Sequence, residues 1–195
     1  MSWALVKQKP IMDKPFHYPP RCLAGGFLPS YMKTSEAALW GLVAGAAGVA
    51  AMTLAEKIEQ HFTHRPDSYV PAHTLARLLG LPPRPDAQRL GLNWTMHWGT
   101  GILVGAARGI MAAKGGRGAV GSFLFMNLRL LNDQLLENAT GAGSPPWKWP
   151  RDEQVIDLVH KGIYAFVTGA LADQLVSGPP CPPVPRPGWT TGRPA

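Results

Sequence analysis

The sequence predicts an all-α fold: a polytopic membrane four-helix bundle with Pro-rich, largely disordered termini. Residues 37–55 carry no charged side chain and would extend about 28 Å as a helix, close to the hydrocarbon thickness of a bilayer. Three later segments show the same apolar character more weakly. Charged residues make up only 16 % of the chain, and its 20 prolines lie outside these four segments.

Composition divides the 195 residues into one central domain and two tails. Residues 1–34 are predicted to be a disordered N-terminal tail, and residues 178–195 a Pro-rich C-terminal tail. The transmembrane domain covers residues 35–177. Two cysteines, Cys22 and Cys181, fall in the tails, and their spacing supports neither a metal site nor a disulfide framework.

The first two helices are predicted at residues 37–58 and 92–113, and the second is uncharged except for Arg108. The third and fourth are predicted at residues 119–136 and 155–176. Each of these later helices has a short uncharged run that on its own favours a buried helix of a soluble protein. We expect them to span the membrane as well, because their polar residues can face the interior of a bundle.

A short amphipathic helix is predicted at residues 71–79, with Pro71 at its start and Gly80 just past its end. Leu75, Leu78 and Leu79 would form its apolar face. That face would lie on the membrane surface or would pack over the protein as a lid, and the sequence leaves both open.

The distribution of Lys and Arg predicts a topology. Ten lie in the two tails and around the turn at residues 113–118, against seven in the 61–91 connector and the 144–152 loop with their flanks. The excess places both termini on the cytoplasmic side. The sequence does not indicate which membrane.

Two rows of glycines predict close helix contacts. Gly41 and Gly45 form one G-x-x-x-G pair, and Gly101, Gly105 and Gly109 form a longer ridge. In a bilayer such rows let helix backbones approach closely. They predict packing within one bundle or, alternatively, a homo-oligomer formed through the ridges.

The charged residues of the predicted helices balance in number and so predict an internal polar network. This network comprises Arg108, Arg129 and Lys161 with Glu137, Asp157 and Asp133. Positions near helix ends would also fit side chains that reach the membrane surface, and Arg129 with Asp133 would fit a local ion pair.

Four residues are candidate catalytic groups: His97, Asp133, His160 and Tyr164. A histidine beside a carboxylate can act as a general acid and base, and the same residues can relay protons when water reaches them. Haem or metal ligation would need further ligands at suitable spacing, which the sequence lacks. We therefore predict no metal site and assign no cofactor.

The net charge of +7 indicates the partners. The cations are scattered singly rather than gathered on one face, which excludes a nucleic-acid-binding interpretation and favours anionic lipid headgroups. The expected partners are the lipid bilayer and a lipophilic small molecule.

Five stretches resemble a group of mostly bacterial four-helix membrane proteins without a settled activity, loosely similar to the YagU type of inner-membrane protein. They are GLVAGAAGVAAMTLAEK (41–57), SYVPAHTLARLLG (68–80), NWTMHWGTGILVGAARG (93–109), LLNDQLL (130–136) and PPWKWP with HKGIYAFVTG (145–150, 160–169). The resemblance covers residues 37–176 and implies four membrane helices with the four candidate catalytic residues at motif positions. The chain departs from the family pattern at Gln134 and Ala165, which argues against a role for paired acids at 133–134.

The predicted function is an enzyme or accessory factor that acts on a lipophilic small molecule, for example in specialised metabolism, at an intramembrane His/Asp pocket. The alternatives are a proton- or solute-handling membrane protein and a purely structural one.

Overall fold

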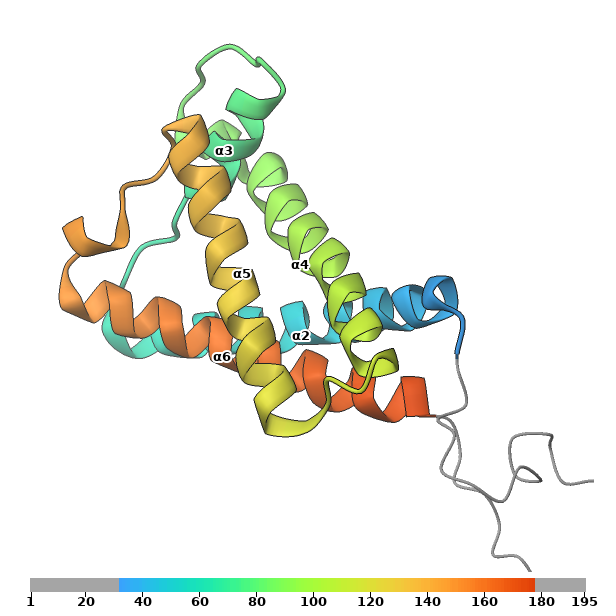
Figure 1. Ribbon diagram of the computed structural model, residues 1–195. Helices are drawn as coiled ribbons and strands as arrows, with labels where there is room; N and C mark the ends of the chain where they lie inside the picture. Colours follow the sequence, from blue (N-terminus) through green and yellow to red (C-terminus); the bar gives the residue numbers. More distant parts are fainter. Residues whose placement is uncertain (1–31, 178–195) are drawn as a thin grey trace, which may run out of the picture. The chain divides into compact units, whose positions relative to one another are not determined.

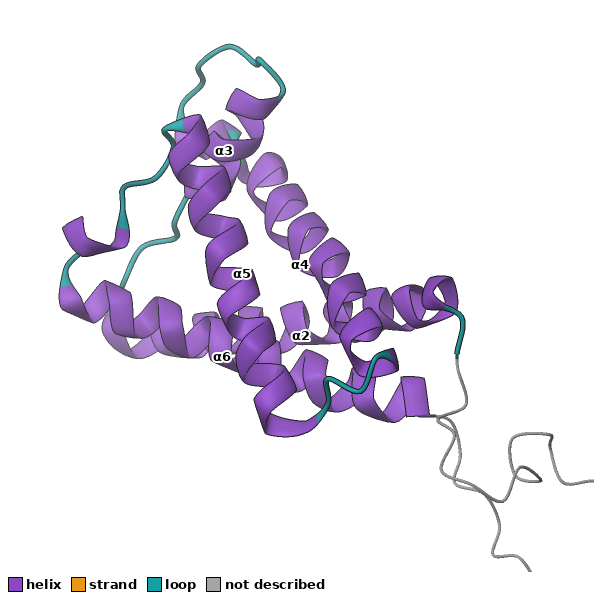
Figure 2. Cartoon of the chain, in the orientation of Figure 1, coloured by secondary structure: helices purple, strands orange, loops and turns teal. Residues whose placement is uncertain are grey.

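The computed structural model describes residues 32–177 of the chain. The predicted C-terminal tail, the predicted N-terminal tail up to residue 31, Cys22 and Cys181 lie outside the described residues. Within residues 32–177 the regular secondary structure is helical and contains no strand, as Figure 1 and Figure 2 show. The predicted all-α class is confirmed.

Four long helices account for most of the described residues, and each overlaps one of the predicted helices. They are α2 (Thr34–Thr63), α4 (Leu90–Ala113), α5 (Gly118–Thr140) and α6 (Arg151–Ser177). Two of them end at residues in the left-handed backbone region, His64 after α2 and Gly141 after α5. Glycine adopts that conformation without a steric cost, which explains the stop at Gly141.

The connectors contain one short helix, α3 (Val70–Leu78), and two single 3-10 turns, η1 (Asp86–Gln88) and η2 (Pro146–Lys148). Helix α3 packs against α4 through small side chains, because Ala72, Thr74 and Ala76 are the residues that it buries. Leu78 and Leu79 of the predicted apolar face are instead exposed. One face of α3 thus covers the protein, as a lid would, while the exposed leucines leave contact with a membrane surface possible at the same time.

The closest helix contact is the crossing of α2 over α4, where the glycine rows meet (Figure 1). A Cβ atom on Gly109 would lie 2.0 Å from the carbonyl oxygen of Ala37, and one on Gly105 would lie 2.6 Å from that of Gly41. No side chain fits at such distances, so the backbones touch directly. Both rows are buried within one chain, and a homo-oligomer through them would require α2 and α4 to separate.

The helices come together at one end of the domain, which we call the closed end. There Ala37 of α2, Ala112 of α4 and Val176 of α6 form one buried apolar cluster. A larger cluster near the middle of the helices includes Val49 and Phe125. Beyond it α4 and α5, although consecutive, contact each other far less than α4 contacts α2. We call this other end, which carries α3, the cavity end.

Two arginines are buried inside the domain, while many large apolar side chains are exposed on its outside. Arg108 is 0 % exposed and Arg129 is 4 % exposed, whereas Leu103 is 69 % and Val120 is 73 % exposed. Large apolar side chains face outward on all four long helices.

Two helices of the described region, α2 and α6, are long and apolar enough to cross a membrane, judged by length and composition. Helices α4 and α5 are long enough to cross a membrane, but their composition is not apolar enough to count as candidate spans. The reason lies in their sequences, since α5 carries Arg129, Asp133 and Glu137, while α4 carries His97 and Arg108. The observed helices thus give two candidate spans, fewer than the predicted four.

The α2–α4 contact predicts a strong dependence on glycine at one position. Substitution Gly109→Leu places a side chain where backbone already lies, and we expect it to lower the free energy of unfolding by about 1–3 kcal/mol or more. The matched control is Gly99→Leu on the same helix, where a Cβ meets nothing within 4 Å. Thermal unfolding followed by circular dichroism in detergent measures both. Equal melting temperatures for the two variants would contradict the contact.

Candidate functional site

A cavity of about 500 Å³ opens at the cavity end of the domain. Residues of α2, α3, α4, α5 and α6 line it, together with the 64–69 connector and the 141–150 loop. Its wall is unusually rich in ionisable groups. These are Glu56, Lys57, Arg65, Asp67, His97, Arg129, Asp133, Glu137, Lys148, Glu153, Asp157, His160 and Lys161.

Asp133 of α5 is the centre of the buried charges. Its Oδ2 atom lies 3.2 Å from Nε of Arg129 and 3.4 Å from Nζ of Lys161. Lys161 also donates to Asp157, one turn away on α6. The i, i+4 spacing on each helix and the packing of α5 against α6 bring the four side chains together. Two cations and two carboxylates compensate one another, which is what burial of charge requires.

Arg129 keeps hydrogen-bonding capacity after these pairings. Its guanidinium lies over the ring of Tyr164, with Cζ 5.3 Å from the ring centroid. The Nε and Nη1 atoms are buried and have no hydrogen-bond partner within residues 32–177. Nε of Arg129 lies at ion-pair distance from Oδ2 of Asp133 but outside hydrogen-bond geometry. Arg129 therefore lines the cavity while two of its nitrogens stay buried behind the wall.

The structure brings three of the four predicted catalytic residues to this cavity: His97, Asp133 and His160. His97 Nε2 lies 3.2 Å from Oγ1 of Thr53 on α2, and the direction of that hydrogen bond depends on the tautomer. Neither histidine is hydrogen-bonded to Asp133 among the described side chains. The carboxylate is held by two cations and does not orient an imidazole.

Tyr164 does not line the cavity. Its side chain is fully buried, and its hydroxyl donates to the carbonyl oxygen of Gly101 at 2.6 Å. This bond joins α6 to α4 at a position where the glycine leaves the backbone accessible. The tyrosine thus connects two helices.

Arg108 is also separate from the cavity and lies near the closed end. Its Nη2 donates to Oδ1 of Asp173 at 2.8 Å, and Oδ2 of the same carboxylate accepts the N–H of Gly118 at 2.8 Å. Asp173 therefore connects α4, α6 and the start of α5. The predicted network did not include Asp173, whose sequence signal is a single carboxylate within the otherwise uncharged residues 162–176.

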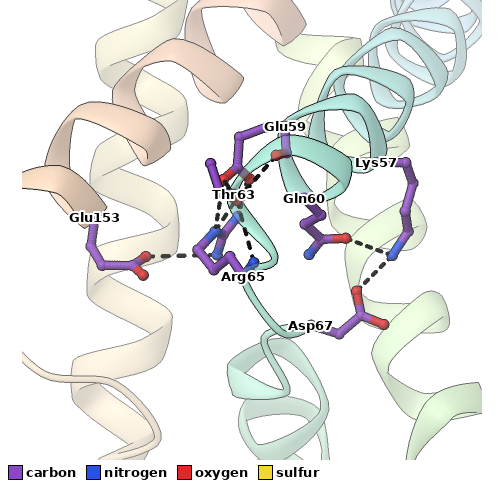
Figure 3. A network of polar contacts seen from close by, with 7 residues as sticks. All are labelled: Lys57, Glu59, Gln60, Thr63, Arg65, Asp67 and Glu153. Carbon is purple, nitrogen blue, oxygen red and sulfur yellow. Dashed lines mark hydrogen bonds and ion pairs between the residues drawn. The ribbon is translucent and has the colours of Figure 1, made fainter.

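The rim of the cavity is held by ion pairs from the 64–69 connector, which Figure 3 shows. Arg65 binds Glu59 of α2 with Nη2–Oε2 at 3.0 Å and approaches Glu153 of α6 at 3.6 Å. Lys57 donates to Asp67 at 2.6 Å, and this hydrogen bond lowers the pKa of the Asp67 carboxyl below its ordinary value. The connector is thereby tied to two helices.

Asn93 fastens the same connector to α4. Its Oδ1 accepts the N–H of Ala72 at 3.1 Å, and its Nδ2 donates to the carbonyl oxygen of Ser68 at 3.0 Å. Sequence reasoning did not identify Asn93, Arg65 or Glu153 as parts of the site. Their contacts join residues separated by at least six positions, and no local pattern marks them.

Within residues 32–177, no three His, Cys, Asp or Glu side chains are grouped as they would be to hold a metal ion. The arrangement supplies instead a chamber lined by paired charges and two imidazoles. Such a chamber can bind a polar group and transfer protons to or from it.

The central position of Asp133 predicts a large effect on stability. Asp133→Asn leaves buried Arg129 without its carboxylate partner and leaves Lys161 with Asp157 alone, and we expect a loss of about 3–5 kcal/mol in the free energy of unfolding. His160→Asn, at a half-buried side chain of the same cavity, and the exposed control Asp152→Asn should change it by about 0.5 kcal/mol or less. Denaturant titration in detergent measures all three. If Asp133→Asn changed the free energy of unfolding as little as the two control substitutions do, the ion pairs assigned to Asp133 would be contradicted.

No family model, curated protein or solved structure matches this chain. The resemblance to the four-helix membrane family therefore stays a prediction, and the functional argument rests on the geometry of the cavity and of the surfaces around it.

Proposed function

We propose that this chain is a multi-pass membrane protein that binds an amphiphilic small molecule in the cavity between its four long helices. The observation that carries the proposal is the burial of paired charges inside the domain together with the exposure of large apolar side chains on all four long helices. The proposal takes α4 and α5 as spanning helices in addition to the two candidate spans. The family resemblance, with its four membrane helices, supports the same architecture.

The outer surfaces support a lipid environment. Leu39, Leu103, Leu128 and Phe166, one from each long helix, are all exposed. Exposed apolar surface on this scale is unfavourable in water and favourable against acyl chains. Exposed Asn127 is accommodated because its amide donates to the carbonyl oxygen of Phe123 at 2.8 Å. A polar side chain that bonds its own helix is tolerated in a bilayer.

The interior supports the spanning of α4 and α5 despite their charges. An ionisable residue at the bilayer centre costs roughly 2.5–3.5 kcal/mol on insertion scales when it faces lipid. Arg108, Arg129 and Asp133 are all buried and ion-paired inside the bundle. These three residues therefore lower the mean hydropathy of α4 and α5 without exposing a charge to lipid.

The form of the cavity favours binding over conduction. Its volume of about 500 Å³ lies within the range of small-molecule sites. On the side of the closed end, the buried cluster residues Val49, Phe125 and Tyr164 lie about one turn beyond the last cavity residues of α2, α5 and α6. A proton- or solute-handling protein would need a polar path through that layer.

The lining supports a ligand with an uncharged head rich in oxygen acceptors. The deep charges compensate one another, so an ionic head would leave a net charge buried. An uncharged carbonyl or hydroxyl oxygen can instead accept hydrogen bonds from the cations and imidazoles of the lining without adding a charge. Met52, Trp94, Met96 and Trp149 line other parts of the wall and would contact the apolar portion.

Two residues are the favoured proton-transfer groups, if the bound molecule reacts. Asp133 is engaged with two cations, whereas His97 and His160 line the cavity without an ion-pair partner among the described residues. An imidazole can donate or accept a proton through its ring nitrogens, so these two side chains suit this role. His97, with Thr53 as its neighbour, is the deeper of the two.

The proposed membrane topology follows from where the helix ends lie and from the distribution of Lys and Arg. The start of α2 and the end of α6 meet at the closed end, together with the turn at residues 114–117. With the predicted excess of Lys and Arg on that side, both termini would be cytoplasmic, and the cavity would open toward the opposite side.

The test is a comparison of the compounds that co-purify with three forms of the full chain. We expect wild type to retain an amphiphile. The retained amount should be at least tenfold greater than in Thr100→Phe, whose larger side chain would occupy part of the cavity. Leu103→Phe, on the lipid-facing side of the same helix, should retain it as wild type does. Extraction of detergent-purified protein and mass spectrometry measure the amounts. Equal amounts in wild type and Thr100→Phe would contradict ligand binding.

A fourth form, His97→Asn, separates an enzyme from an accessory factor. An enzyme yields a compound in wild type that differs in mass from the one retained by this variant. An accessory factor yields the same compound in both.

A further inference from the structure

A second cavity, separate from the one described above, lies between α3, the connector that follows it and the first turn of α4. It has a volume of about 490 Å³. Ala76, Leu81, Pro82 and Leu92 supply an apolar wall, and Arg84 and Arg89 supply the charge. We call this cavity the arginine groove.

The arginine groove carries a net positive charge, because none of its lining residues is acidic. Asp86 is the carboxylate in this connector. Its Oδ1 lies 2.9 Å from Nε2 of His73 on α3, and Asp86 does not line the groove. The contrast with the main cavity is clear, since the charges there are compensated by partners in the protein.

The side chain of Arg89 is buried and held in place by the backbone. It is 5 % exposed, and its Nε donates to the carbonyl oxygen of Arg84 at 2.7 Å. This bond curls the connector so that both arginines line one groove. Two arginines that line one groove, one of them held by this bond, suit the recognition of phosphate oxygens.

The position of the groove matches the depth of lipid headgroups. Trp94, one turn into α4, is exposed and stacks on Trp98 with ring centroids 6.2 Å apart. Tryptophan is enriched at the interface between hydrocarbon and water. The groove lies just outside this pair, and exposed Leu78 and Leu79 adjoin it at the end of α3.

We propose that the arginine groove binds an anionic phospholipid, with its phosphate at Arg84 and Arg89 and the start of one acyl chain along Leu81 and Leu92. The proposal rests on the membrane location proposed above and does not depend on the ligand of the main cavity. Charge complementarity identifies the occupant: a doubly cationic, acid-free groove beside apolar surface fits an anionic amphiphile and disfavours a zwitterionic one.

The experiment uses the full chain, purified in detergent, delipidated and mixed with dioleoyl phosphatidylglycerol or dioleoyl phosphatidylcholine. Native mass spectrometry measures the lipid retained. We expect wild type to prefer phosphatidylglycerol and each arginine to contribute about fivefold to its affinity. Arg84→Gln should therefore reduce retention about fivefold. Arg151→Gln, an exposed arginine at the start of α6 and outside the groove, is the matched control and should bind as wild type does.

Arg84→Gln keeps the backbone carbonyl that accepts from Arg89, so it tests the site without removing that bond. Circular dichroism confirms that it folds. Equal retention by Arg84→Gln and wild type would overturn the proposal, as would equal retention of the two lipids. Displacement of phosphatidylglycerol by millimolar inorganic phosphate would also overturn it, because it would identify a free-phosphate site without a contribution from the acyl chain.

Discussion

The arrangement of the described domain depends on the direct backbone contact between α2 and α4. Gly41, Gly105 and Gly109 let the two helices touch at a distance that admits no side chain. A crossing this close, displaced toward one end of both helices, brings their other ends apart. Arg108 and Asp173 hold α6 and α5 to the same end. The cavity is thus a geometric consequence of where the small residues lie.

Electrostatics then determines what occupies the space between the separated ends. Asp133 bridges Arg129 and Lys161, so the deepest charges are compensated inside the protein. Ion pairs of Arg65 and Lys57 hold the connector across the rim. The two imidazoles, which line the cavity without an ion-pair partner among the described residues, are the groups left for a ligand. The arginine groove has the opposite character, because its cations have no acidic neighbours in the lining.

Sequence reasoning predicted the helices and the glycine contact well, because both depend on local patterns. A long uncharged run or a G-x-x-x-G spacing can be recognised within a single short stretch of the sequence. The identity of partners was harder to predict. Asp173 pairs with Arg108 across 65 positions, and Asn93 holds Ser68 across 25, and nothing local marks either pair. Tyr164 shares a helix face with His160, but its hydroxyl meets Gly101 of α4 because α6 and α4 cross there.

The central claim is that lipid surrounds the outer faces of the long helices and that polar groups face one another inside. Nitroxide spin labels at Leu103, Leu128 and Phe166, in a chain whose Cys22 and Cys181 are changed to serine, test it directly after reconstitution into vesicles. The account predicts that molecular oxygen relaxes these labels more strongly than a water-soluble nickel chelate does, and that a label at Thr100 shows the reverse order. Stronger relaxation by the nickel chelate at the three outward positions would contradict it.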